Sequence, residues 1–163
     1  MELVPFDEQR LPELMQWFGD ASECRAWGGP HFRFPYTAAT FREDAGLATL
    51  SSWALLDGRN GFVAFGQYYR RVGRCHLSHM AVAPHARNRG IGTRLIRELC
   101  SRGAAELGTD EFSLFVLERN AAAARLYRRL GFETTTYPET LPSSEPMLYM
   151  VATGAAAAAL RMP

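Results

Sequence analysis

The spacing of apolar and polar residues predicts alternating strands and helices along the whole chain. Apolar side chains that recur every three or four residues indicate amphipathic helices, while short alternating or continuous apolar runs indicate strands. Strands are expected at residues 1–6, 48–57, 61–70, 74–83, 111–117, 132–138 and 146–153. Helices are expected at residues 7–19, 37–46, 91–108 and 120–131, and the Gly-, Pro- and aromatic-rich residues 23–36 are expected to form a loop.

The connections between these elements restrict the topology. Residues 57–61 (DGRNG) and 71–73 (RVG) are so short that the three strands they join must form an antiparallel meander. After Pro84 the order becomes β-α-β-α-β-β, which requires a crossover helix between parallel strands. The sequence therefore predicts an α/β fold in which a central mixed, largely antiparallel sheet of about seven strands is flanked by about four helices.

Length and composition agree with one globular domain. The chain has 163 residues, of which 47% are hydrophobic and 21% charged, and this balance excludes a disordered protein. We expect one domain over residues 1–153, followed by an alanine-rich tail over residues 154–163 that forms a frayed helix.

Charge and cysteine content bear on the cellular setting and the partners. The net charge of +1 provides no general attraction to nucleic acid or membranes. No apolar run reaches the ~20 residues of a membrane-spanning helix, and the acidic N-terminus has no signal-like segment. The three cysteines have no metal-ligand spacing, so we expect free thiols, a cytoplasmic protein, and neither a metal nor a membrane or nucleic-acid partner.

The junction before the third predicted helix is unusual. Arg87-Asn88-Arg89-Gly90-Ile91-Gly92 combines two arginines and two glycines at a helix N-terminus, where free N–H groups and the helix dipole favour anions. Glycines remove the side chains that would keep a ligand from the backbone. The segment thus predicts a phosphate site, although a tight turn with solvated arginines would also explain it. Neither the P-loop nor the dinucleotide-binding fingerprint fits it.

Two motifs resemble those of the GCN5-related N-acetyltransferases, the GNAT superfamily. The first is R-x-x-G-x-G at residues 87–92, after MAVAP. The second, about thirty residues on, is N-x-x-A-x-x-x-Y-x-x-x-G-F at residues 120–132. Their order and separation fit the predicted frame, and the resemblance implies a single-domain GNAT-like fold. It also implies acetyl-CoA as co-substrate and direct acetyl transfer to a primary amine in a ternary complex, and it allows a homodimer.

The resemblance also assigns roles to individual residues. The loop amides would hold the pyrophosphate of acetyl-CoA, and the backbone of Met80 and Val82 would pair with the pantetheine arm. Asn120 would bind the same arm through its amide. The cofactor-binding residues implied in this way are Met80, Ala81, Val82, Arg87, Asn88, Arg89, Gly90, Ile91, Gly92, Thr93, Asn120, Ala123 and Tyr127.

Tyr127 and His76 are the catalytic candidates. A tyrosine phenol of pKa ≈ 10 stays protonated at neutral pH, so Tyr127 can protonate a departing thiolate. His76 and His79 are three positions apart on a strand and face opposite sides, so only one can face the cleft. By the family's spacing this is His76, a candidate general base; the alternatives are a water chain or solvent, and an ordinary strand histidine.

The acceptor site is predicted from the aromatic loop and from one strand residue. Trp27 and Phe32 are candidate acceptor contacts, and Ser78 shares the face of His76. Alternatively, the loop's aromatic side chains simply cover the core. The acceptor is a small amine or a peptide or protein amine. A GNAT-like acetyl-CoA sensor without turnover is a second interpretation, and a nucleic-acid-binding domain is a third that the charge disfavours.

Overall fold

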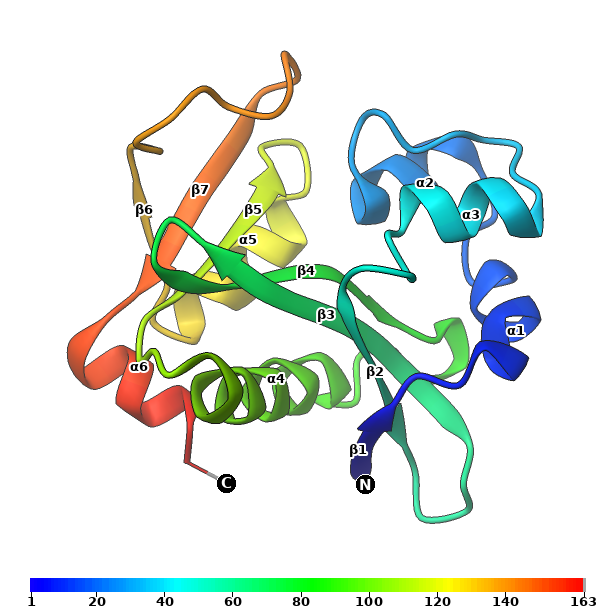
Figure 1. Ribbon diagram of the computed structural model, residues 1–163, viewed down its shortest axis with the longest axis horizontal. Helices are drawn as coiled ribbons and strands as arrows, with labels where there is room; N and C mark the ends of the chain where they lie inside the picture. Colours follow the sequence, from blue (N-terminus) through cyan, green and yellow to red (C-terminus); the bar gives the residue numbers. More distant parts are fainter. Residues whose placement is uncertain (163) are drawn as a thin grey trace. The chain divides into compact units, whose positions relative to one another are not determined.

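A computed structural model describes residues 1–162 and divides the chain into two compact units. Unit 1 comprises Met1–Gln67 and His79–Leu95, and unit 2 comprises Tyr68–Ser78 together with the chain from Ile96 onward. The seven strands of residues 1–162 follow the order β1-β2-β3-β4-β5-β7-β6 (Figure 1). The expected α/β fold with a mixed, seven-stranded sheet is therefore confirmed.

Unit 1 contains the N-terminal strands, three short α-helices and two short 3-10 helices, which are labelled η. Strand β1 pairs antiparallel with β2, and the short connections predicted from the sequence join β2, β3 and β4 in order. The elements are β1 (Glu2–Pro5), η1 (Glu8–Arg10), α1 (Leu11–Met15), α2 (Ala21–Gly28), α3 (Ala38–Asp44), β2 (Ser51–Leu56), most of β3 (Phe62–Arg71), the end of β4 (Arg74–Val82) and η2 (Pro84–Ala86).

Helix α2 corrects the prediction that residues 23–36 form a loop. The Asp20 side chain accepts a hydrogen bond from the Glu23 N–H at 2.8 Å, and the Glu23 side chain accepts one from the Gly19 N–H, also at 2.8 Å. This reciprocal capping satisfies two backbone donors at the helix start. The helix ends at Gly28, and Gly29 follows with a φ of +93°, a conformation that favours glycine.

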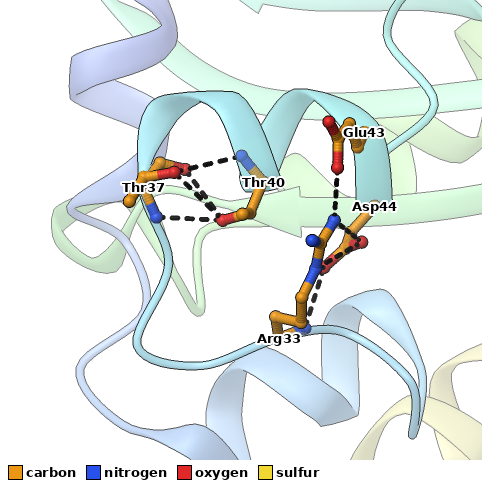
Figure 2. A network of polar contacts seen from close by, with 5 residues as sticks. All are labelled: Arg33, Thr37, Thr40, Glu43 and Asp44. Carbon is orange, nitrogen blue, oxygen red and sulfur yellow. Dashed lines mark hydrogen bonds and ion pairs between the residues drawn. The ribbon is translucent and has the colours of Figure 1, made fainter.

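Helix α3 was predicted, and Thr37 is its N-cap (Figure 2). Thr37 and Thr40 form a capping box, each side chain accepting a hydrogen bond from the other residue's N–H. Glu43 and Asp44 lie in the last turn, where the helix dipole disfavours negative charge. Arg33 offsets this, because its guanidinium binds Asp44 through Nε and Nη2 and Glu43 at 2.7 Å.

Unit 2 contains the crossover part of the sheet. The elements that lie wholly within it are β5 (Phe112–Leu117), α5 (Ala121–Arg129), β6 (Glu133–Thr135), β7 (Met147–Ala152) and α6 (Gly154–Leu160). Strand β5 runs parallel to β4, and β7 runs antiparallel to both β5 and β6. The parallel pair confirms the crossover between residues 83 and 111. Helix α4 (Ile91–Leu107) makes it, and its first turn belongs to unit 1.

The apolar stripe of α4 is buried and consists of Ile91, Leu95, Ile96 and Leu99. The tail also differs from expectation: α6 buries Ala157 and Leu160, so it is a packed helix rather than a frayed one. None of the helices in residues 1–162 is long and apolar enough to span a membrane.

Candidate functional site

The loop before α4, within unit 1, has the backbone geometry of an anion site. Asn88 and Gly90 have φ angles of +60° and +75°, and a Cβ placed on Gly90 would meet no atom within 4 Å. Residues 87–90 are exposed, and the first turn of α4 carries no acidic side chain. The first N–H groups of α4 have no intrahelical acceptors. The loop therefore offers open, unblocked donors to a negatively charged group.

The Arg87 side chain turns toward its own unit. Its Nε donates to the Val82 carbonyl at 3.3 Å, and its Nη2 lies 3.5 Å from the Trp17 carbonyl. Its Nη1 is 3.8 Å from the Glu23 carboxylate, in an ion pair that is exposed on both sides. The Arg87 side chain thus stabilises the loop. Arg89 is exposed and has no hydrogen bond or ion pair with another residue of the described chain.

The end of β4 carries an irregularity at His79. The backbone there has a φ of +47°, which is unusual for a residue other than glycine and interrupts the regular pleat. The ladder with β5 covers Cys75–Leu77. Met80, Ala81 and Val82 come after the irregularity and are half-buried. The strict alternation of faces expected for a regular strand therefore does not extend through His79.

The His79 ring is held by the Gln67 side chain within unit 1. Its Nδ1 lies 2.5 Å from Gln67 Oε1, and a neutral imidazole has one N–H with which to donate to that oxygen. Gln67 uses its amide nitrogen to donate to Ala45 O at 2.9 Å, so its oxygen is the acceptor for His79. Burial lowers the pKa of His79 to about 4, although the Gly28 carbonyl opposes this shift. His79 is therefore neutral at pH 7, and its ring lies within unit 1.

The aromatic residues of the predicted loop form a packed cluster. Trp27 stacks on Phe18 and Phe41 at centroid distances of 4.4 and 5.3 Å, and Phe32 is only 3% exposed. The His79 ring is 5.1 Å from the Trp27 ring. This arrangement favours the interpretation in which the aromatic side chains cover the core of unit 1, and it leaves Phe32 little surface for an acceptor.

His76 lies in unit 2 and is buried, with 2% of its surface exposed. Its Nδ1 is 2.9 Å from the Oγ of Ser113, its register partner on β5. Its ring packs against Tyr69 and Phe115 at 5.2 and 5.0 Å. Ser78, two positions along the strand, has a buried Oγ without a hydrogen-bond partner among the described residues. Sequence reasoning found His76 but missed Ser113, whose only signal is strand register.

Tyr127 lies on α5 in unit 2, and its side chain is half-buried. No hydrogen bond is formed by its hydroxyl within residues 1–162, and its ring packs on Phe132 at 6.0 Å. Burial raises the pKa of Tyr127 to about 12. The phenol is therefore protonated across the neutral range and available as a proton donor.

The rest of helix α5 differs in part from expectation. Asn120 is the N-cap, and its side chain accepts from the Ala123 N–H at 3.3 Å. Ala124 is buried, whereas Ala123, the candidate cofactor contact, is half-buried. Leu126 and Leu130 are also half-buried. Gly131 follows the helix with a φ of +91°, a conformation that glycine adopts readily after the C-cap of a helix.

A polar and aromatic cluster in unit 2 was not predicted. The Arg71 guanidinium donates to the hydroxyls of Tyr137 and Tyr69, both at 2.9 Å, and lies over the Phe115 ring at 5.0 Å. Tyr149 is 2% exposed, and its hydroxyl has no hydrogen-bond partner among the described residues. Such a buried, unpaired hydroxyl costs about 1–3 kcal/mol.

The cysteines are free and buried within the described chain. Burial raises the pKa of the Cys75 thiol to about 12 and that of Cys24 to about 11. Thiols with such pKa values contain almost no thiolate at pH 7. Cys75 is therefore no nucleophile at neutral pH.

The comparison with known families decides the assignment. The profile of the acetyltransferase (GNAT) family matches residues 11–132. The chain belongs to the GNAT family. The matched region includes both motifs identified in the sequence, at residues 87–92 and 120–132. The fold agrees with that of solved GNAT proteins, and the resemblance drawn from those two motifs is confirmed.

Individual relatives give the following likenesses. A thialysine N-epsilon-acetyltransferase of Mus musculus is 35% identical over 82 residues, which span 47% of this chain and 48% of that protein. The match thus covers about half the length of that curated relative. A spermidine N-acetyltransferase from Vibrio cholerae, solved with CoA and spermine, is 15% identical; the likeness covers 92% of this chain and 93% of that chain, with a TM-score of 0.70.

A third relative acts on a protein. The ribosomal-protein-S18-alanine N-acetyltransferase from Escherichia coli is 23% identical, covering 93% of this GNAT chain and 92% of that chain, with a TM-score of 0.62. At such identities the solved structures establish the shared fold. Their acceptors are different amines, so the fold is compatible with more than one acceptor class.

Proposed function

We propose that this GNAT protein is an acetyl-CoA-dependent N-acetyltransferase that acts directly on a primary amine. The family match over residues 11–132 carries the proposal, because it contains both the glycine loop and the Tyr127 helix. The relatives named above are all N-acetyltransferases, and their named acceptors are amines. A metal is not needed for this chemistry.

The chain offers a fitting cradle for the co-substrate in unit 1. Gly90 leaves the space above the loop open, and the N-terminal amides of α4 attract negative charge, which suits a pyrophosphate. Residues 87–93 would hold this group. The backbone of Met80–Val82, beyond the part of β4 that is in the β5 ladder, would pair with the pantetheine arm as an added strand.

Tyr127 would act as the general acid. Acetyl-CoA supplies a thioester: as the amine nitrogen bonds to the carbonyl carbon, the C–S bond breaks and a thiolate leaves. Tyr127 has a protonated hydroxyl without a protein partner among residues 1–162, and it would give its proton to the thiolate sulfur. Solvent then returns a proton to the phenolate. Asn120 and Ala123 lie on the same helix, and we assign them to cofactor binding.

His76 would take the proton that the amine loses. The Ser113 hydroxyl holds its Nδ1 and fixes the orientation of the ring. A lysine-type amine has a pKa near 10.4 and is mostly protonated at pH 7, so a base accelerates the attack. The net reaction converts one amine and one thioester into one amide and one thiol. The transfer is direct, so no covalent enzyme intermediate forms. Ser78, on the same strand as His76, is the remaining candidate acceptor contact in unit 2.

The experiment that tests the proposal measures thiol release from acetyl-CoA with a panel of amines. The panel contains peptides with free N-termini or lysines, polyamines, arylalkylamines and amino acids. We expect turnover with one class, and a loss of about 10²-fold or more in kcat for Tyr127→Phe. Tight CoA binding without release from any amine would contradict the proposal and identify a binding module.

A further inference from the structure

One ring in unit 2 is the centre of a cluster with unusual polar properties. Phe115 lies 5.0 Å from the His76 ring, the Arg71 guanidinium carbon and the Tyr137 ring, and 5.3 Å from the Tyr149 ring. We call these residues, together with Tyr69, the Phe115 cluster. They come from β3, β4, β5, β7 and the segment after β6. Arg71, Phe115 and Tyr69 are half-buried and retain exposed surface.

The positive charge of Arg71 has no carboxylate partner. The polar partners of its guanidinium within residues 1–162 are the two phenol oxygens, which accept from Nε and Nη1 and leave Nη2 unused. Glu139 binds the Tyr137 hydroxyl at 2.9 Å and not Arg71 itself. The two phenol oxygens and the faces of the Phe115 and Tyr137 rings stabilise this half-buried cation without neutralising its charge. The cation therefore favours an anionic ligand.

Tyr149 provides a second and independent sign of a ligand. Only 2% of the surface of Tyr149 is exposed. Its hydroxyl is buried and has no hydrogen-bond partner among the described residues. Its ring packs on Tyr137 at 4.9 Å, and Tyr137 in turn lies under the Arg71 guanidinium at 5.4 Å. An unused cationic donor and an unused hydroxyl donor thus occur in one cluster of rings.

We propose that the Phe115 cluster binds a carboxylate carried by the acceptor, so that the preferred acceptor is an amine that is also an acid. Arg71 supplies the charge-assisted donor and Tyr149 a second hydroxyl donor. The Phe115 cluster as defined contains one guanidinium, whose single charge matches that of one carboxylate. The inference rests on the proposed function, in which His76 receives the amine proton. The centre of the His76 ring and the guanidinium carbon of Arg71 each lie 5.0 Å from the centre of the Phe115 ring. The proposed base and the proposed carboxylate partner are therefore close enough to contact one small acceptor.

The same charge would act against polyamines. A second ammonium group on the acceptor would approach the Arg71 guanidinium and be repelled, because like charges in a poorly solvated site interact strongly. The acceptor class inferred here therefore differs from that of the solved spermidine N-acetyltransferase.

The test compares three acceptors of equal chain length: aminohexanoate, hexylamine and hexanediamine, which end in a carboxylate, a methyl and an ammonium group. Shorter and longer homologues of each are included. For the wild-type protein we expect kcat/KM for the amino acid to exceed that for the matched alkylamine and diamine by about tenfold or more. In Arg71→Met, which keeps an apolar stem, this ratio should fall to about one. Tyr149→Phe should lower it severalfold.

Arg70→Met is the matched control. Arg70 is the neighbouring residue on β3, and its guanidinium donates to the Leu107 carbonyl rather than to the cluster. We expect the preference ratio of this variant to equal that of the wild type. A wild-type preference for the diamine or the alkylamine at every length would overturn the inference while leaving the proposed function intact, as would an unchanged ratio in Arg71→Met.

A binding measurement covers the case in which no amine is acetylated and the proposed function fails. The CoA-loaded protein is titrated with the amino acids by calorimetry. Binding that is lost in Arg71→Met and kept in Arg70→Met supports the carboxylate site. Absence of binding to the wild-type protein, or equal binding to both variants, overturns it.

Discussion

The imidazole of His76 and the hydroxyl of Ser113 meet across β4 and β5, with Nδ1 2.9 Å from Oγ. Both residues are buried, at 2% and 0% exposure, so neither polar group can be satisfied by bulk water. The contact depends on a parallel register that pairs His76 with Ser113. It gives the proposed base a fixed ring orientation before any acceptor binds.

Removing the Ser113 hydroxyl should impair both stability and turnover. Ser113→Ala leaves the buried Nδ1 of His76 without this partner, and we expect the free energy of unfolding to fall by about 1–3 kcal/mol. If His76 is the base, kcat/KM should also fall severalfold and the acidic limb of its pH profile should move. Denaturant unfolding and the pH profile check the two effects. A lower stability with an unchanged acidic limb would mean that Ser113 is structural and His76 is not the base.

His79 should make the protein less stable in mild acid. Its pKa is lowered to about 4 in the folded state, chiefly by burial, while an unfolded histidine titrates near 6.5. Between these values the unfolded state binds more protons, so the contribution is complete above about pH 6.5 and is lost as the pH falls toward 4. The difference corresponds to about 3 kcal/mol. Urea unfolding at a series of pH values measures it.

The matched variants for this prediction are His79→Asn and His31→Gln. Asparagine tolerates the positive φ of position 79 and does not titrate, so the dependence on pH between 4 and 6.5 should flatten. His31 is exposed, and its replacement should leave the dependence as in the wild type. Equal slopes in His79→Asn and the wild type would show that other groups cause the acid sensitivity.

Gly90 and Gly73 form a matched pair for testing the pyrophosphate loop. Their φ angles are +75° and +76°, and a Cβ on either would meet nothing within 4 Å. Alanine at each position should therefore cost a similar amount of stability, about 1–2 kcal/mol. Only Gly90→Ala places a methyl group where the phosphate would approach, so its Kd for CoA should rise about tenfold or more. Equal Kd values for both variants in calorimetry would refute the loop assignment.

Gly103 allows α4 to approach β4 within unit 2. A Cβ at this position would lie 2.4 Å from the Cys75 Sγ and 3.3 Å from the Tyr68 ring. Gly103→Ala should therefore destabilise the fold by about 1–3 kcal/mol despite the better helix propensity of alanine. Cys75→Ala frees the space of the sulfur, so the double variant should recover part of the loss. Strictly additive effects in unfolding experiments would contradict the contact.

The order of strands and helices could be predicted from the sequence because most of these elements have strong local signals. The apolar stripe of α4, the capping threonine of α3 and the two short hairpin connections each require nothing beyond neighbouring residues. Helix α2 was missed because its glycine and aromatic content suggested a loop, while its start depends on the cap between Asp20 and Glu23. Composition alone does not reveal a reciprocal cap.

The candidate site was predictable only where a motif is local. The glycine loop and the Tyr127 helix could be read from consecutive residues, whereas the Ser113 contact depends on the pairing of distant strands. The same holds for Arg71, whose phenol partners include Tyr137, 66 positions away. The irregular backbone at His79 also escaped prediction, since a strand pattern gives no sign of a positive φ.

The most direct measurement of the central claim is the stoichiometry of acetyl transfer, followed by mass spectrometry of the acceptor and assay of the free thiol. All 18 Lys and Arg residues of the chain are arginines, so the chain contains no lysine. Any acetyl-lysine that is detected must therefore come from an added acceptor. We predict one acetylated amine for each thiol released, no release without an amine, and no acetyl group left on the protein. CoA binding without any acetylated amine, or thiol release that does not depend on an amine, would contradict the account.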